Sequence, residues 1–464
     1  MTEYDSYLSP FSWRYGSKEM RQIWSEHSRR LIWRQIWVAL AEVQAEFNLV
    51  TPDQLSDLCA HLHAVDIPRA LEIEAEIHHD LMAELRVFAE QCKVGGGIIH
   101  LGATSMDIED NADAIRMHQA LDLLIAKLAG LLRTLGLLIH KWADTPLMAF
   151  THLQPAEPST LGYRLSLYGQ DLLEDYRAIC MARRELKGKG FKGAVGTSAS
   201  YADLFGQDNL VRFEPRLSEK LNLPFYAVTS QTYPRKQDFL VISTLAGLAA
   251  SLYKFAFDLR ILQSPLLGEL AEPFGKKQVG SSAMPFKRNP IRAEKVNSLA
   301  RYLAGLPRLA WDNAAHSLLE RTLDDSANRR IMLPEACLAA DELLETTNTI
   351  ITGLSVDEQA VARNLEIYGP FAATERVLMA LVKAGADRQV MHERIRDHAM
   401  NAWEMIRQGV SSPLLDSLQA DKEITRYIPK NELTVLLDAR AHIGDAPQRA
   451  RQMAESIRVV IEPG

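Results

Sequence analysis

The stretch that decides the fold is ADAIRMHQALDLLIAKLAGLLRTLGLLIHKW, residues 112–142. Its apolar residues recur every three or four positions, which predicts an amphipathic α-helix and not a strand. Long helices with wide apolar faces are typical of bundles whose members also pack against partner subunits. Runs with strand-like alternation are scarce, so we expect an all-α protein with a central long-helix bundle. The same spacing recurs in four further segments: 160–187, 236–264, 288–317 and 330–354.

Breaks in the helical pattern predict the domain boundaries. They fall at the triple glycine 95–97, at 187–196 and near 353–358, where glycine interrupts the apolar periodicity. A length of 464 residues exceeds one ordinary hydrophobic core and suggests about three domains. We therefore expect three helical domains: an N-terminal domain at 1–103, the central long-helix bundle at 104–356, and a smaller C-terminal domain at 357–464.

The composition and charge argue against two classes of partner. Hydrophobic residues make up 47% of the chain and charged residues 24%, and the net charge is −7. Nucleic-acid-binding proteins usually carry a basic balance, so we expect no nucleic-acid partner. The most apolar stretch, 245–267, contains Lys254, Asp258 and Arg260. A membrane span should lack such charges, so we expect a buried bundle helix there and no membrane partner.

The cysteines and the first residues indicate the compartment. The four cysteines lie far apart and show no CxxC spacing, which fits reduced thiols better than a disulfide framework. The chain begins MTEYDS, which is polar and acidic and lacks the features of a secretory signal. We therefore expect a cytoplasmic protein.

Two patterns resemble cofactor or metal sites but lack the context that such sites need. Residues 188–193, GKGFKG, match GxGxxG, yet a dinucleotide site requires a strand before the motif and a helix after it. The pairs His61, His63 and His78, His79 match no HExxH or Cys/His ligand spacing. His78 and His79 also cannot share one helix face, because adjacent residues of a helix point about 100° apart. We expect no cofactor and no metal.

Residues 280–290, GSSAMPFKRNP, collect the groups that an anion-binding loop needs. The glycine frees the backbone, and the two prolines keep the segment out of regular helix. Ser281 and Ser282 supply hydroxyls, and Lys287 and Asn289 supply further donors. The simpler alternative is a polar surface loop in which one serine caps a helix.

Two other polar segments precede long predicted helices. Thr104 and Ser105 come just before the helix that contains 112–142, and hydroxyls with free N–H groups at a helix start can bind a carboxylate. A simple N-cap is the alternative. His152 is expected near a helix start as well, where the helix dipole favours a neutral imidazole. This makes His152 the leading acid–base candidate.

Together these segments closely resemble the signature sequences of the fumarase/aspartase superfamily, whose members eliminate fumarate from a substituted succinate. The resemblance covers most of residues 10–400. It implies a homotetramer with a twenty-helix core and active sites built from three subunits, and no cofactor. The matching segments, in the expected order, are AEIHHD (75–80), HLGATS (100–105), THLQPA (151–156), TSQTYPRK (229–236) and the loop at 280–290.

The resemblance also implies roles for individual residues. Ser281 would remove the substrate proton, and His152 would protonate the leaving nitrogen while Glu294 orients its imidazole. A free serine hydroxyl is a weak base, so Ser281 must be deprotonated by surrounding cations and N–H groups once the loop closes. Lys287 and Asn289 would stabilise the charge that develops in the transition state. The other implied site residues are His79, Asp80, Thr104, Ser105, Thr151, Gln231, Ser282 and Met284.

Two arginine-containing segments narrow the range of possible substrates. ERTLDDSANRR (320–330) and RYGSKEM (14–20) resemble the branch of the superfamily that acts on nucleotides. Guanidinium groups bind phosphate oxygens in a fixed fork geometry. The implied phosphate-binding residues are Arg14, Tyr15, Arg321, Ser326 and Arg330.

Three alternatives remain at this point. The arginine segment can be a solvated helix face in which Asp324 and Asp325 neutralise the arginines. The chain can be another lyase of the superfamily, with a substrate that lacks a phosphate. It can also be a catalytically silent helical oligomer, although the presence of Ser281, His152 and Lys287 together argues against that.

Overall fold

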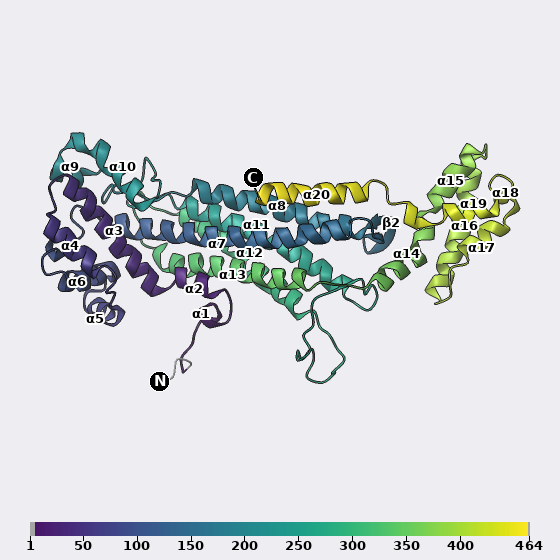
Figure 1. Ribbon diagram of the computed structural model, residues 1–464, viewed down its shortest axis with the longest axis horizontal. Helices are drawn as coiled ribbons and strands as arrows, with labels where there is room; N and C mark the ends of the chain where they lie inside the picture. Colours follow the sequence, from purple (N-terminus) through teal and green to yellow (C-terminus); the bar gives the residue numbers. More distant parts are fainter. Residues whose placement is uncertain (1–4, 463–464) are drawn as a thin grey trace. The chain divides into compact units, whose positions relative to one another are not determined.

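The computed structural model describes residues 5–462, which form helices almost throughout (Figure 1). These residues contain twenty α-helices, three short 3-10 helices and two small antiparallel sheets of two strands each. The prediction of an all-α protein is confirmed.

Five long helices match the five segments predicted from the apolar periodicity. Their starts follow the local sequence, since α12 begins directly after Pro290 and α11 begins two residues after Pro234, and proline disfavours helix in the residue before it. The long helices are α7 (Ser105–Lys141), α8 (Leu161–Glu185), α11 (Lys236–Leu262), α12 (Ile291–Ala315) and α13 (Ser326–Thr352).

Shorter helices precede α7, and side-chain caps define where several of them begin. The Ser25 hydroxyl accepts the Ser28 N–H at the start of α3, and Thr51 and Gln54 form a reciprocal capping box at the start of α4. Such caps satisfy N–H groups that have no partner inside the helix. The elements are α1 (Pro10–Trp13), α2 (Lys18–Ile23), α3 (Glu26–Glu46), α4 (Pro52–His61), α5 (Ile67–Ile77), α6 (Asp80–Gln91) and η1 (Gly96–Ile98).

The remaining elements lie between and after the long helices. Between them come β1 (Pro146–Thr151), β2 (Gln154–Thr160), α9 (Ala199–Phe205), η2 (Gln207–Asn209), α10 (Leu210–Leu221) and β3 (Leu270–Ala271). After them come β4 (Ser355–Val356), α14 (Glu358–Ala372), α15 (Thr374–Lys383), α16 (Arg388–Arg407), α17 (Leu414–Ala420), α18 (Lys422–Thr425), α19 (Lys430–Leu436), η3 (Ala439–Ala441) and α20 (Ala446–Ile461).

The chain divides into two compact units, and the long helices contribute residues to both. Unit 1 comprises Met1–Leu128, Asp175–Ala250 and Ser298–Glu345. Unit 2 comprises Ala129–Glu174, Ser251–Asn297 and Thr346–Gly464. The three domains expected along the sequence (1–103, 104–356 and 357–464) remain a prediction.

Unit 1 has an aromatic core around α3. Trp33 and Trp37 are almost completely buried there, and Trp37 stacks on Phe88 of α6 with ring centroids 6.3 Å apart. Beside this core the buried Glu84 carboxylate accepts hydrogen bonds from Arg34 at 2.7 Å and from Arg30 at 3.1 Å. Charged groups can be buried here because each one is paired and hydrogen-bonded.

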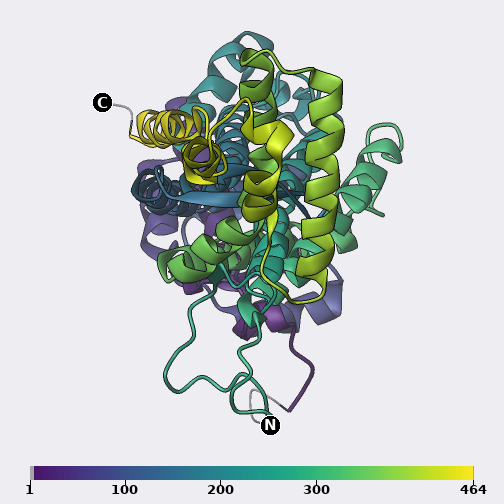
Figure 2. The same cartoon turned by 90° about the vertical axis from the view of Figure 1, so that its right-hand side faces the viewer.

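Unit 2 contains the β1–β2 hairpin and the C-terminal helices, which face the viewer in Figure 2 (yellow-green). The hairpin packs against α14, where Phe150 and Tyr368 meet edge to face with centroids 6.4 Å apart. Helices α15 to α19 enclose a separate apolar cluster that includes Leu381, Leu418 and Leu433.

Two long helices, α7 and α11, are long and apolar enough to cross a membrane when judged by length and composition alone. Their most apolar stretches are only 39% and 44% buried within the chain. Core helices of a long bundle share these properties, so the observation is weak evidence for a membrane span. It does show that both helices keep apolar surface that this single chain leaves uncovered.

Candidate active site

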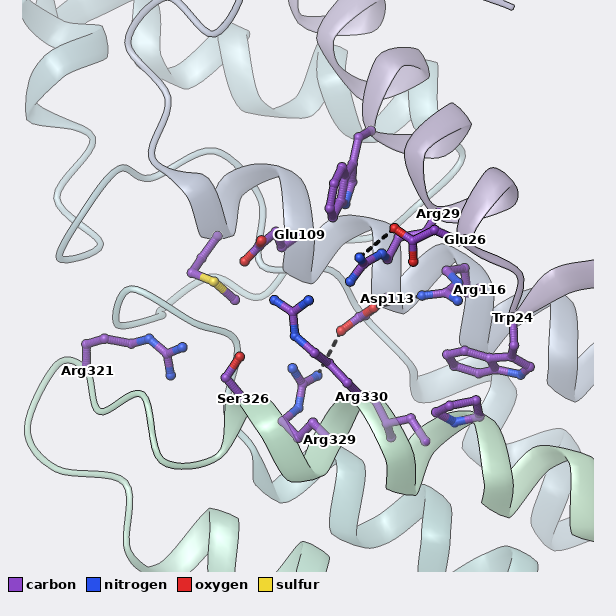
Figure 3. Close-up of a pocket in the computed structure, with 14 residues that line it drawn as sticks. Trp24, Glu26, Arg29, Glu109, Asp113, Arg116, Arg321, Ser326, Arg329 and Arg330 are labelled. Atoms are coloured by element: carbon purple, nitrogen blue, oxygen red, sulfur yellow. Dashed lines mark hydrogen bonds and ion pairs between the residues drawn. The ribbon is translucent and has the colours of Figure 1, made fainter. Parts of the chain in front are cut away.

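Unit 1 contains a pocket of about 310 Å³ at the start of α13, and arginines dominate its walls (Figure 3). Arg321 comes from the loop before α13, and Ser326 and Arg330 come from its first turns. Arg29 of α3, Arg116 of α7 and Arg329 of α13 complete the basic lining. The structure therefore brings together three of the five residues expected to bind phosphate.

The other two expected phosphate ligands lie elsewhere in unit 1. Arg14 is exposed, and its guanidinium lies 5.7 Å from the Trp13 ring centroid and 5.9 Å from that of Tyr15. Neither Arg14 nor Tyr15 lines the arginine pocket among the described residues.

A buried ion network fixes the start of α13. Arg235 donates to Asp325 at 2.6 Å and to Asp110 at 3.0 Å, and Asp325 also accepts from Arg321 at 2.8 Å. Burial alone would raise the pKa of Asp325, but Arg235 and Arg321 lower it below its ordinary value. The alternative of a solvated, salt-bridged face holds for Asp325 only in part: this carboxylate pairs with Arg321, but it is buried and not solvated.

Neighbouring arginines on α13 point to different environments. Arg329 turns inward, where it donates to Asp238 and to the Tyr233 hydroxyl, each at 2.7 Å. Arg330 is half exposed and pairs with Asp80 at 2.7 Å. This follows from the angle of about 100° between consecutive helical residues. The network of Arg235 and Arg329 was not predicted, because buried and solvated charges look alike in a sequence.

The predicted site residues at the start of α6 lie beside the same pocket. His79 is the N-cap of α6, and its Nε2 lies 3.4 Å from the Ser105 hydroxyl oxygen. Asp80 is buried, and Arg330 lowers its pKa although burial alone would raise it. His78 ends α5 in the left-handed conformation. The two histidines thus diverge at a helix break, and not along one helix as we expected.

Thr104 and Ser105 stand at the start of α7, as expected. The Thr104 N–H donates to the Asp107 carboxylate at 3.1 Å. Asp107 is fully buried and pairs with Lys189. An acidic side chain therefore satisfies this N–H group.

The GxGxxG segment at 188–193 takes part in the buried ion pairs next to the start of α7. It follows the long helix α8, and irregular chain separates it from α9, so it lacks the strand and helix that a dinucleotide site needs. Lys189 and Lys192 are buried in pairs with Asp107 and Glu214.

In unit 2, residues 280–290 form the expected loop. The Ser281 hydroxyl accepts the N–H groups of Ala283 at 3.3 Å and Met284 at 3.1 Å. The Asn289 side chain donates to the Gly280 carbonyl at 2.8 Å. Ser281 caps no helix, since the next one is α12 at Ile291, so the capping alternative is wrong for this serine. The Ser282, Met284 and Lys287 side chains are exposed.

His152 lies in a different local structure from the one we expected. It occupies the tight turn between β1 and β2, and α8 begins only at Leu161. His152 and Leu153 have φ of 53° and 58°, values that favour glycine and asparagine. The helix-dipole argument for a neutral imidazole is therefore wrong. The signal we missed is the strand-like pairing of 146–151 with 154–160.

The surroundings of His152 are open and partly apolar. Its neighbours Leu153 and Gln154 line a hollow of about 690 Å³ in unit 2, together with residues of α8 and α11. Glu294 lies in the first turn of α12, 3.9 Å from Arg260. Within residues 5–462, His152 has no hydrogen bond or ion pair with a carboxylate.

Thr151 is exposed at the end of β1. The Gln231 N–H donates to the Glu320 carbonyl at 3.1 Å. This bond ties 229–236 to the segment that carries Arg321.

One group of side chains has the composition of a metal site. Ligand atoms of Asp57, His61 and Cys92 lie within 4.8 Å of one another. The Asp57 carboxylate already accepts the N–H groups of Gly95 and Val94, which lower its pKa. Burial raises the pKa of the Cys92 thiol to about 11, which opposes the thiolate form that binds metals. The geometry fits a structural contact that holds α4 against the loop after α6.

Comparison with known proteins defines the class of this chain. Residues 14–305 match the family model described as "Lyase", and residues 370–453 match the one described as "Adenylosuccinate lyase C-terminus". The fold is also that of 3-carboxy-cis,cis-muconate lactonizing enzyme from Pseudomonas putida, with TM-score 0.85, 26% identity, and 96% and 99% of the two chains covered. A fumarate lyase from Mesorhizobium sp. BNC1 shares the fold at TM-score 0.84 and 22% identity, with 97% and 99% covered. The chain is thus a helical lyase.

Curated relatives narrow the family. Adenylosuccinate lyase from Saccharomyces cerevisiae is 41% identical over 463 residues, covering 98% of this chain and 95% of the relative. The Schizosaccharomyces pombe enzyme is 38% identical, covering 97% and 94%, and the Schistosoma mansoni enzyme is 40% identical, covering 91% and 89%. The chain belongs to the adenylosuccinate lyase family, and the superfamily resemblance noted in the sequence is confirmed.

Proposed function

We propose that this chain catalyses the β-elimination of fumarate from adenylosuccinate, giving AMP, and from the succinylcarboxamide ribotide of de novo purine biosynthesis. The observation that carries the proposal is the pocket where Arg321, Ser326 and Arg330 converge. A substrate with a phosphate monoester uses such donors, whereas a substrate without one leaves them unsatisfied.

The phosphate would lie against the first turn of α13. Arg321 and Arg330 supply charged donors, and Ser326 adds a hydroxyl at the helix start, where free N–H groups and the helix dipole also favour an anion. The buried Asp325 accepts a hydrogen bond from Arg321 at 2.8 Å. Arg321 is therefore already ordered before the substrate binds, and less conformational entropy is lost on binding. Arg14 and Tyr15 are proposed to complete the site from another subunit.

The elimination needs a base, an acid and donors for the developing negative charge. Ser281 is proposed as the base that removes the proton next to a carboxylate, and His152 as the acid that protonates the leaving nitrogen. Glu294 would orient His152, and Lys287 and Asn289 would stabilise the anionic transition state. The remaining proposed substrate-binding residues are His79, Asp80, Thr104, Ser105, Thr151, Gln231, Ser282 and Met284.

The active protein is proposed to be a homotetramer whose subunits share active sites, working in the cytoplasm without a cofactor. Uncovered apolar surface on the long helices supports the assembly. Leu137 of α7 is 69% exposed, Leu240 of α11 is 54% exposed and Ile331 of α13 is 59% exposed. Large apolar side chains left exposed on bundle helices are typical of surfaces that pack against partner subunits.

The experiment that tests this function is the release of fumarate and AMP from adenylosuccinate by the purified protein, with argininosuccinate in parallel. Activity on adenylosuccinate alone is the expected result. Activity on argininosuccinate alone would keep the elimination chemistry but overturn the phosphate assignment. Absence of activity on both substrates would favour a catalytically inactive helical oligomer.

A further inference from the structure

The arginine pocket contains one carboxyl group that the proposed chemistry does not use. Glu109 of α7 lines the pocket, and in Figure 3 its carboxyl faces the guanidinium of Arg330. The other acidic residues of the lining are paired: Glu26 with Arg29 at 2.7 Å and Asp113 with Arg329 at 3.3 Å. Within the described residues 5–462, no hydrogen bond or ion pair engages Glu109.

The charges around Glu109 oppose its ionisation. Burial is the largest effect, and the carboxylate of Asp80 at the start of α6 adds to it, as do Asp113 and Asp110 on the same helix. Arg330 of α13 acts in the opposite direction but does not cancel them. Together they raise the pKa of Glu109 to about 8. In the empty pocket near neutral pH, this carboxyl is therefore mostly protonated.

We propose that Glu109 is the proton-carrying residue of this pocket: its carboxyl is protonated when a phosphate occupies the arginine cluster, and it donates a hydrogen bond to a phosphate oxygen. This inference rests on the proposed function only in placing a phosphate monoester here. The proton comes from solvent, and no covalent bond is formed or broken.

The physical reason is the interaction between two anions. A carboxylate facing a phosphate dianion can only repel it, because both groups are acceptors. A protonated carboxyl has one O–H donor, and hydrogen bonds to an anionic acceptor are strong. The bound phosphate therefore raises the pKa of Glu109 further. Between the pKa values of the free and bound states, binding takes up a proton, and affinity falls as the pH rises.

The test is calorimetric binding of AMP to the intact protein between pH 7.5 and 9, each pH in two buffers of different ionisation enthalpy. This range lies above the second phosphate pKa of about 6 and the usual histidine pKa of about 6.5. We expect proton uptake that rises across this range and approaches one per site at pH 9. Above pH 8 the affinity should fall by about tenfold per pH unit. Inorganic phosphate is the second probe and should show the same uptake.

Two variants locate the proton. Glu109→Gln keeps the shape and a permanent neutral donor, so we expect AMP binding without proton uptake and with flat affinity across this range. Glu26→Gln removes a carboxylate from the same pocket, but one whose pKa is lowered by Arg29 and Arg30 despite burial. We expect this control to keep the uptake and the pH dependence of the wild type.

The outcomes separate this inference from the proposed function. Fumarate release together with AMP binding that takes up no proton would overturn the inference alone, as would proton uptake that persists in Glu109→Gln. Proton uptake with AMP in a protein that releases no fumarate would overturn the function alone. Failure of both AMP and phosphate to bind would overturn the inference, because the arginine pocket would then not be a phosphate site. The proton uptake of the wild-type protein tests the inference even if a variant fails to fold.

Discussion

The arginine pocket of unit 1 and the serine loop of unit 2 are held in place by opposite means. Arg321 is fixed through Asp325 to the buried Arg235, so the pocket is tied to a charged network inside the fold. The loop is exposed, and the hydrogen bonds around Ser281 and Asn289 lie within the loop itself. We infer that binding is built into a rigid scaffold, whereas chemistry is carried by a segment that can move.

The largest expected effect is on the loop. Ser281→Ala should lower kcat by about 10³-fold or more, in the upper part of the range for loss of general acid–base catalysis. KM should change little, and so should the thermal unfolding midpoint, because no bond of Ser281 reaches beyond the loop. Steady-state assays and a thermal melt check this. Ser456→Ala, at an exposed position of α20, is the control, and near-normal kcat in Ser281→Ala would rule out the base assignment.

The second effect is on the scaffold. Arg235→Met should lower the free energy of unfolding by about 3–5 kcal/mol, because it leaves the buried carboxylates of Asp110 and Asp325 without their shared partner. Urea unfolding measures the loss. The matched control is Arg449→Met, which removes an exposed pair with Asp445 and should leave the free energy of unfolding nearly unchanged. Equal losses in the two variants would contradict a scaffold role for the network.

The third effect falls on binding. Arg330→Gln should raise KM for adenylosuccinate by about 10–100-fold, the equivalent of one or two charged hydrogen bonds, and should lower kcat far less than Ser281→Ala does. Steady-state kinetics separate the two parameters. Arg308→Gln, an exposed arginine of α12 paired with Asp312 at 3.0 Å, should leave both parameters unchanged. If Arg330→Gln lowered kcat and left KM unchanged, the pocket would contribute to the chemical step and not to substrate binding.

The smallest effect concerns the shape of the loop. A Cβ at Gly280 would lie 2.1 Å from the Lys287 carbonyl oxygen, so Gly280→Ala must shift the loop and should lower kcat by about tenfold. Gly305→Ala in α12 meets nothing within 4 Å and should stabilise the helix by up to about 1 kcal/mol. Kinetics and melts of both variants test this. Unchanged kcat in Gly280→Ala would show that the loop shape is irrelevant to turnover.

The sequence predicted the parts whose signals are local. The five long helices follow from apolar periodicity, and the serine loop follows from Gly280 and its prolines. The grouping of Arg321, Ser326 and Arg330 follows from the resemblance of residues 320–330 to the superfamily. Each of these patterns is complete within a short stretch of chain, so no tertiary information is needed to recognise it.

The parts that the sequence did not predict depend on contacts between distant segments. The buried network joins Arg235 to Asp110 and Asp325, residues that are 125 and 90 positions away. Glu109 differs from an ordinary helical glutamate only through what surrounds it in space. His152 was misplaced because THLQPA was taken as a helix start, whereas the pairing of β1 with β2 makes it a hairpin turn.

The central claim is that the arginine pocket binds the phosphate of an adenylosuccinate-type substrate. The most direct measurement compares kcat/KM for adenylosuccinate with kcat/KM for the same compound lacking its 5′-phosphate, in the wild type and in Arg330→Gln. We predict that the wild type favours the phosphorylated substrate by about 10³-fold or more, as expected when several charged hydrogen bonds are lost together, and that Arg330→Gln narrows this ratio. Equal kcat/KM for the two substrates in the wild type would contradict the account.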